Sequence, residues 1–83
     1  MLRKKIDLLL KPVWTTRDIM AYFKVGRDKA TRMKEEVILK GNGAVPLSDY
    51  EVFTDTCIKM FCNHSVAEEM EILKNACLAY ETK

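Results

Sequence analysis

Long apolar runs, histidine and closely spaced cysteine pairs are all scarce in this sequence. It has one histidine, His64, and no nucleophile–base pairing stands out, which argues against an enzyme. The apolar run Leu8-Leu9-Leu10 ends at Lys11-Pro12, too short for a secretory signal or a membrane span. There are no repeats and no low-complexity stretch. The 83 residues allow one domain with a thin core, and a composition of 48% hydrophobic and 31% charged residues is that of a globular chain. A small binding module is the class that remains.

The cysteines argue against a metal site and a disulfide framework. Cys57, Cys62 and Cys77 are odd in number and include no CxxC pair, whereas zinc ribbons and fingers use ligands two to four residues apart. A zinc site that combines them with His64 is therefore not expected, and neither is a cofactor. We expect reduced thiols buried on helix faces in a cytoplasmic protein, with His64 as a capping or loop residue.

A net charge of +2 hides two halves of opposite sign. Residues 1–40 hold eleven Lys and Arg against five acids, and residues 41–83 hold three Lys against seven acids. This division fits a domain that presents one face to a polyanion, although small helical proteins also carry uneven charge by chance.

The spacing of apolar residues predicts several short helices. The first runs from Arg3 to Lys11 and stops at Pro12. Val13-Trp14 then supplies an apolar anchor, and a Thr cap starts a two-turn helix from Arg17. That helix breaks at Lys24-Val25-Gly26, and the next runs from Arg27 to about Leu39, with Gly41-Asn42-Gly43 ending it.

Residues 44–53 admit two interpretations. Ser48-Asp49-Tyr50-Glu51 matches a capping box that would start a helix at Asp49. The preferred alternative is a β-hairpin over residues 44–53, since Val52 and Phe53 favour a strand and Thr54 can cap the helix that follows. Trp14, Phe23, Phe53 and Phe61 are expected in the core.

Two helices follow, one over residues 54–62 and one after a second capping-box pattern, Ser65-Val66-Ala67-Glu68. The last helix carries an apolar stripe at alternating spacings of four and three, namely Val66, Met70, Leu73, Cys77 and Tyr80. This stripe packs either onto Ile6, Leu9, Leu10 and Trp14 of the same chain or onto a second copy. The sequence favours the intramolecular packing, because two heptads are short for a coiled coil, and it leaves a homodimer through residues 66–80 as the alternative.

Two short helices joined by a tight break, the second rich in Arg, Lys and Thr, form a helix-turn-helix pattern. The segment from residue 14 to residue 30, WTTRDIMAYFKVGRDKA, resembles the opening of excisionase-like DNA-binding domains of phages and mobile elements. Residues 43–45 and 52–54 are similar to the wing of such proteins, so that the resemblance covers about residues 13–62. The sequence departs from the family pattern at Met20, where a small residue is usual, and at Lys24, where the turn Gly is usual.

The resemblance implies a mainly α fold with a small β-hairpin, a winged helix-turn-helix with an additional C-terminal helix. It forms one domain over residues 1–83, with the helix-turn-helix at about 16–39, the wing at about 44–53 and C-terminal helices at about 54–82. The implied recognition helix presents Arg27, Asp28, Thr31, Arg32 and Glu35, and Lys29 and Lys34 are further phosphate contacts. Thr16 and Arg17 are expected to hold phosphates at the start of the bracing helix, and Ser48 and Tyr50 to form the wing tip. Arg27 and Arg32 are the best candidates for guanine edges or phosphates.

The expected function is sequence-specific binding of double-stranded DNA, as an excisionase-like architectural factor or a small transcriptional regulator. A recombinase or a repressor is a possible protein partner, and no membrane contact is expected. The alternative is a helical protein–protein adaptor or antirepressor that uses the same basic face. A DNA-packaging or replication accessory is a third class.

Overall fold

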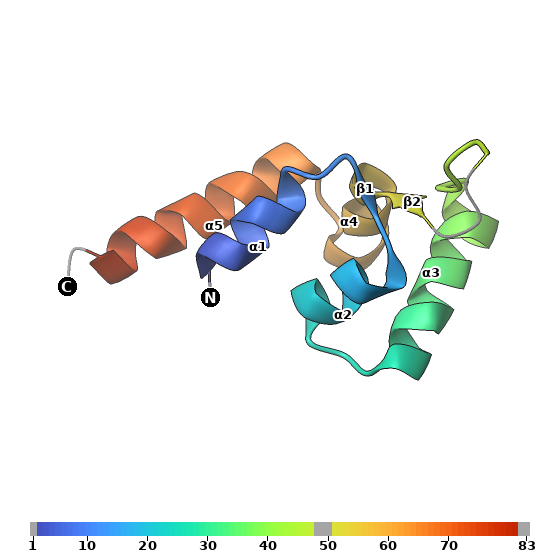
Figure 1. Cartoon of the computed structure of the whole chain (residues 1–83). Helices are drawn as coiled ribbons and strands as arrows, with labels where there is room; N and C mark the ends of the chain where they lie inside the picture. The colour runs from blue at the N-terminus through green and yellow to red at the C-terminus, as the bar shows by residue number, and fades with distance from the viewer. Residues whose placement is uncertain (1, 48–50, 82–83) are drawn as a thin grey trace.

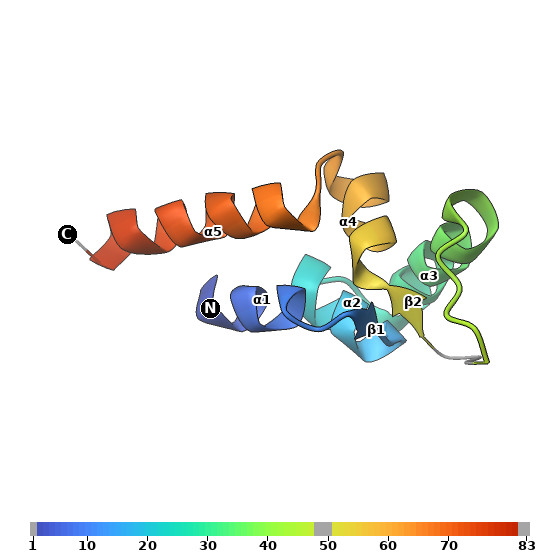
Figure 2. The ribbon, with the colours of Figure 1, turned by 90° about the horizontal axis from the view of Figure 1, so that it is seen from above.

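The computed structural model describes residues 2–47 and 51–81. Over these residues the chain forms five helices and two short strands: α1 (Leu2–Leu9), β1 (Val13–Trp14), α2 (Thr16–Phe23), α3 (Arg27–Gly41), β2 (Val52–Phe53), α4 (Thr54–Cys62) and α5 (Val66–Glu81). The molecule is elongated, 44 Å along its longest axis. α1 and α5 pack together at one end, and α2, α3, α4 and the strands form the other (Figures 1 and 2). The predicted mainly helical fold with a small β element is confirmed.

The two strands pair in a way that the sequence did not predict. β1 runs antiparallel to β2, with Val13 opposite Phe53 and Trp14 opposite Val52. On the other side of β2, Ala44 forms an isolated bridge to Val52, and the Phe53 N–H donates to the Gly43 carbonyl at 2.9 Å. The Val45 N–H also donates to the Glu51 carbonyl at 3.5 Å. β2 therefore pairs regularly with residues 13–14, and the predicted hairpin arm over residues 44–47 contacts it only through the Ala44 bridge and these two hydrogen bonds. A helix that continues from Asp49 is wrong, because Val52 and Phe53 are in a strand.

The start of α4 also differs from the expectation. Phe53 is the N-cap of α4 and Thr54 is already its first residue. The buried Thr54 hydroxyl donates to the Lys11 carbonyl at 2.7 Å instead of accepting an N–H from the first turn of α4. Thr54 therefore ties α4 to the segment after α1, and it does not cap the helix.

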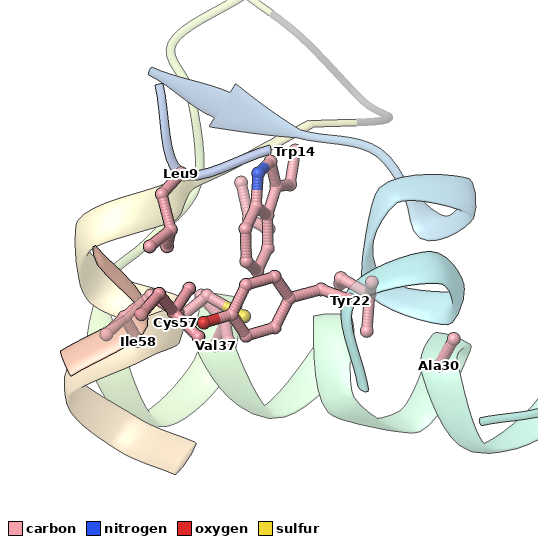
Figure 3. Packing of buried hydrophobic residues seen from close by; sticks show 10 residues of the cluster. Leu9, Trp14, Tyr22, Ala30, Val37, Cys57 and Ile58 are labelled. Carbon is pink, nitrogen blue, oxygen red and sulfur yellow. The ribbon is translucent and has the colours of Figure 1, made fainter. Parts of the chain in front are cut away.

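The core lies between α2, α3, α4 and the sheet, with Trp14 at its centre (Figure 3). Trp14 is fully buried, its indole N–H donates to the Leu8 carbonyl at 2.8 Å, and its ring lies 4.9 Å from that of Tyr22. The expectation of aromatic core residues holds for Trp14, Phe23 and Phe61, which contact this cluster. It fails for Phe53, which is 39% exposed, because the alternation of side chains along a strand turns Val52 inward and Phe53 outward.

The C-terminal helix packs back onto the first helix of the same chain. Leu73 of α5 is buried in the core, and Val66, Met70 and Ile6 pack against the core partly buried. Leu10, which the sequence also placed in this contact, is 69% exposed because the chain turns away after α1. Within the described residues, none of the helices combines the length and the apolar composition that a membrane crossing needs.

Candidate nucleic-acid interface

The start of α2 is held by a capping box. The Thr15 hydroxyl accepts from the Asp18 N–H, and the Asp18 carboxylate accepts from the Thr15 N–H at 3.0 Å and from the Lys11 ammonium at 3.0 Å. Burial alone would raise the pKa of Asp18, but the Thr15 backbone N–H and the Lys11 ammonium outweigh it and hold this pKa below its ordinary value. The ionised carboxylate fixes the first turn of α2, which carries the half-buried Thr16 and the exposed Arg17.

A short turn sets the angle between α2 and α3. Lys24 ends α2 in the left-handed region, at φ 54, and its N–H donates to the Met20 carbonyl. Lys24 thus adopts the left-handed conformation for which a Gly is usual at this point. Gly26 then caps α3 without a side-chain hydrogen bond, at an ordinary φ of −73. A Cβ on Gly26 would meet nothing within 4 Å, so the space beside Gly26 at the start of α3 is open.

α3 buries one face and exposes the rest. Ala30 and Val37 are in the core, which turns the opposite side of the helix to solvent. Of the residues predicted to read DNA, five are exposed and two are half-buried: Arg27, Asp28, Lys29, Arg32 and Glu35 in the first group, Thr31 and Lys34 in the second.

The two arginines of α3 lie on different sides of the helix. Because successive residues turn by about 100°, Arg27 and Arg32 are separated by about 140° around its axis. Arg32 shares the outward side with Asp28 and Glu35, whereas Arg27 lies on the flank of Thr31. The structure therefore does not bring Arg27 and Arg32 together on one surface.

The cations of α2 and α3 that were predicted to contact DNA have no acidic partners within the described part of the chain. Elsewhere Lys11 pairs with Asp18 at 3.0 Å and Lys59 with Asp55 at 3.2 Å. Among residues 2–47 and 51–81, no ion pair or hydrogen bond engages a side chain of this group of five: Arg17, Arg27, Lys29, Arg32 and Lys34. These side chains are available to an external anion. Ser48 and Tyr50, the predicted wing tip, lie outside the described residues.

A groove that the sequence did not predict lies beside α3. Its volume is about 720 Å³, and it has an apolar floor from three elements and the turn between α2 and α3, with charged side chains of α3 along one wall. The floor consists of Phe23, Val25, Met33 and Phe61, and the wall of Asp28, Lys29, Arg32 and Glu36. The aromatic residues were expected only as core. That two of them reach the surface here depends on how α4 crosses α3, which no local pattern reveals.

A polar cluster that the sequence did not predict lies where α4 meets α5. His64 was expected as a capping or loop residue, and it does lie in the link between the two helices, with its Nε2 2.8 Å from Oε1 of Glu69. Cys57 of the rejected zinc group is buried in the core, away from solvent. Of that group, Cys62 and His64 do come together, with Glu69 rather than a third cysteine beside them.

No family model, no curated protein and no solved structure matches this chain. Its function must be argued from its own residues.

Proposed function

We propose that this protein binds double-stranded DNA as a winged helix-turn-helix module, with α3 as the recognition helix and α2 as the bracing helix. The observation that carries the proposal is the set of five cations on α2 and α3 that have no acidic partner among the described residues. Side chains that neutralise no internal charge can replace the counterions of a phosphate backbone, and this exchange is the main source of DNA affinity.

The dimensions and end of α3 suit a major groove. Its 15 residues span about 22 Å, and a groove about 12 Å wide accepts a helix of about that diameter. The open space at Gly26 lets the N-terminal end approach the DNA, as recognition helices of this class do.

The separation of the two arginines assigns them different roles. Arg32, on the outward side with Asp28 and Glu35, faces the base edges, where its guanidinium can bond guanine O6 and N7 together. Arg27, on the flank of α3, contacts a phosphate. Thr16 and Arg17 contact a second phosphate from the start of α2.

The proposed wing begins at residues 44–47, directly after α3. These residues lie beside the C-terminal end of α3 (Figure 1), Ala44 forms a bridge to Val52, and Leu47 is fully exposed. In the proposed complex they approach the DNA backbone next to the recognition helix.

Fluorescence anisotropy with a random-sequence duplex at two salt concentrations tests the proposal. Affinity should fall with a log–log slope of about −0.9 per phosphate contact. Arg27→Ala should weaken all duplexes alike and make the slope shallower by about 0.9. Arg32→Ala should cost about 1–3 kcal/mol on a selected duplex and much less on a random one.

Lys74→Ala is the matched control, since it removes an exposed cation from α5, at the end of the molecule opposite α3 (Figures 1 and 2). It should leave DNA affinity unchanged. If the folded protein binds no duplex at low salt, the proposal is wrong.

The biological role is either architectural, as in excisionase-like factors that bend DNA for a recombinase, or regulatory at a promoter. A duplex labelled at both ends for energy transfer separates the two. Shortening of the end-to-end distance on binding supports the architectural role, and an unchanged distance supports a regulator.

The groove beside α3 favours a second candidate, an adaptor or antirepressor that binds a protein. An apolar floor with charged side chains of both signs on one wall is a common form of peptide-binding surface. Val25→Asp places a charge in this floor and leaves Lys29 and Arg32 of the wall in place. A variant that keeps duplex affinity shows that the apolar floor of the groove is not part of the DNA interface.

A further inference from the structure

Three side chains that bind transition metals converge where α4 ends and α5 begins. Cys62 is the last residue of α4, His64 lies in the link, and Glu69 lies in the first turns of α5. The ligand atoms of the three residues all lie within 4.8 Å of one another. Sγ of Cys62 is 3.5 Å from Oε2 of Glu69, and Nε2 of His64 is 2.8 Å from Oε1 of the same carboxylate.

The backbone between the helices produces this convergence. Asn63 ends α4 in the left-handed region, at φ 59, so that the chain reverses within one residue. Ser65 then caps α5, its hydroxyl accepting the Glu68 N–H at 3.2 Å. Because the cap fixes the rotation of α5, Glu69 is turned towards the end of α4.

The ligand atoms of the three residues are nearly as close together as the donor atoms of a tetrahedral metal site. Bonds of about 2.3 Å to sulfur and about 2.0–2.2 Å to nitrogen and oxygen place the donor atoms of a zinc site roughly 3–4 Å apart. The distances of 2.8 Å from Nε2 to Oε1 and 3.5 Å from Sγ to Oε2 lie near this range, and the bound of 4.8 Å on all separations leaves a small movement to bring the three ligands onto an ion. The side chains of His64 and Glu69 are 23% and 13% exposed, which shields the cluster but leaves a path for an ion.

A hydrogen bond from α2 orients the Glu69 carboxylate for metal binding. The Tyr22 hydroxyl of α2 donates to Oε2 of Glu69. An outer hydrogen bond of this kind orients a metal ligand and raises its affinity for the ion.

We propose that Cys62, His64 and Glu69 form a three-ligand site for Zn²⁺, with water in the fourth position. When the ion binds, the Cys62 thiol releases its proton to solvent, and the resulting thiolate, the carboxylate and a neutral imidazole together carry a charge of −2, which balances the ion. Sulfur, nitrogen and oxygen in one set suit zinc rather than magnesium or calcium, which prefer oxygen alone. The Lys5 ammonium lies over the Tyr22 ring, 5.2 Å from its centre.

Co²⁺ titration of the tag-free, fully reduced protein tests the site, because Co²⁺ replaces Zn²⁺ and absorbs visibly. We expect one Co²⁺ per chain, a thiolate-to-cobalt charge-transfer band, strong d–d bands of a four-coordinate ion, and displacement of all of them by Zn²⁺. A spectrum without the charge-transfer band, or a ratio of half an ion per chain, overturns the proposal.

Variants distinguish the site from adventitious binding. Cys62→Ser should abolish the charge-transfer band, and Cys77→Ser, which removes a thiol from α5, should leave it unchanged. Tyr22→Phe keeps the ring and removes the hydroxyl, and it should weaken Zn²⁺ binding about 10–100-fold while the band persists. Far-ultraviolet circular dichroism of the metal-free variants confirms that each is folded. If folded Cys62→Ser binds Zn²⁺ as tightly as the wild type, the site is wrong.

Discussion

Asp18→Asn is the sharpest test of the capping box that fixes α2, because it removes one charge and changes almost no volume. The Asp18 carboxylate accepts from the Thr15 N–H, the Thr15 hydroxyl and the Lys11 ammonium. An amide has a single acceptor oxygen, and its NH₂ group would face one of these donors.

The expected loss in the free energy of unfolding follows from the hydrogen bonds and the ion pair of Asp18. A hydrogen bond to an ionised acceptor contributes about 1.5–3 kcal/mol against about 1 kcal/mol for a neutral one. The pair with Lys11 adds less than about 1 kcal/mol, because the Lys11 side chain is 51% exposed. The free energy of unfolding should therefore fall by about 1–2 kcal/mol at pH 7, which lowers the Tm by roughly 5–15 °C for a domain of this size.

The loss of stability caused by Asp18→Asn should be larger at neutral pH than in acid. The pKa of Asp18 is lower in the folded protein than its ordinary value of 3.8. Its contribution is therefore complete above about pH 5 and is lost as the pH falls through the folded value. Thermal unfolding followed by circular dichroism at pH 7 and in acid measures this difference. Asp55→Asn, which breaks the exposed pair with Lys59, is the control and should cost about 0.5 kcal/mol or less. A cost for Asp18→Asn that is the same at every pH would refute the electrostatic account.

Three further outcomes are expected from single substitutions. Thr54→Val keeps the shape of a buried side chain but leaves a carbonyl without its donor, and chemical denaturation should show a loss of about 1–2 kcal/mol. Gly43→Ala puts a Cβ against Cγ1 of Val37 in the core, and should cost about 1–3 kcal/mol in the same assay. Leu73→Glu should unfold the protein and Ile72→Glu should not, since Leu73 is buried and Ile72 is 52% exposed. Sedimentation equilibrium should find the wild type monomeric, and a dimer that Ile72→Glu dissociates would contradict the intramolecular packing of α5.

Features governed by neighbouring residues were predictable from the sequence. The cap at Thr15, the break before Gly26 and the start of α5 after Ser65 all depend on hydrogen bonds within one helical turn. The side-chain pattern that produces such bonds is contiguous in the chain. For this reason the helices were found with errors of only one or two residues at most ends.

Features that join distant segments were not predictable in the same way. β1 is two residues long, so no alternation could reveal that Trp14 is in a strand, and its partner Val52 lies 38 positions away. The pairing decided which of Val52 and Phe53 is buried. The Cys62–His64–Glu69 cluster escaped for a related reason: only Cys and His were weighed as ligands, and the helical rotation that turns Glu69 towards them is set by the cap at Ser65.

The charge asymmetry of the sequence overstates the number of cations that the proposed DNA interface can use. Of the eleven cations in residues 1–40, those of α1 lie beside α5, at the end of the molecule away from α3 (Figures 1 and 2). One copy therefore offers to a duplex six cations of α2 and α3 that have no partner among the described residues, the group of five and Lys40, which gives a salt slope no steeper than about −5.4. A slope near twice that value would require two copies on one site, because half-sites read by two recognition helices double the phosphate contacts. The slope thus distinguishes a monomer that binds through α3 from a dimer, and a slope near zero would remove the interface altogether.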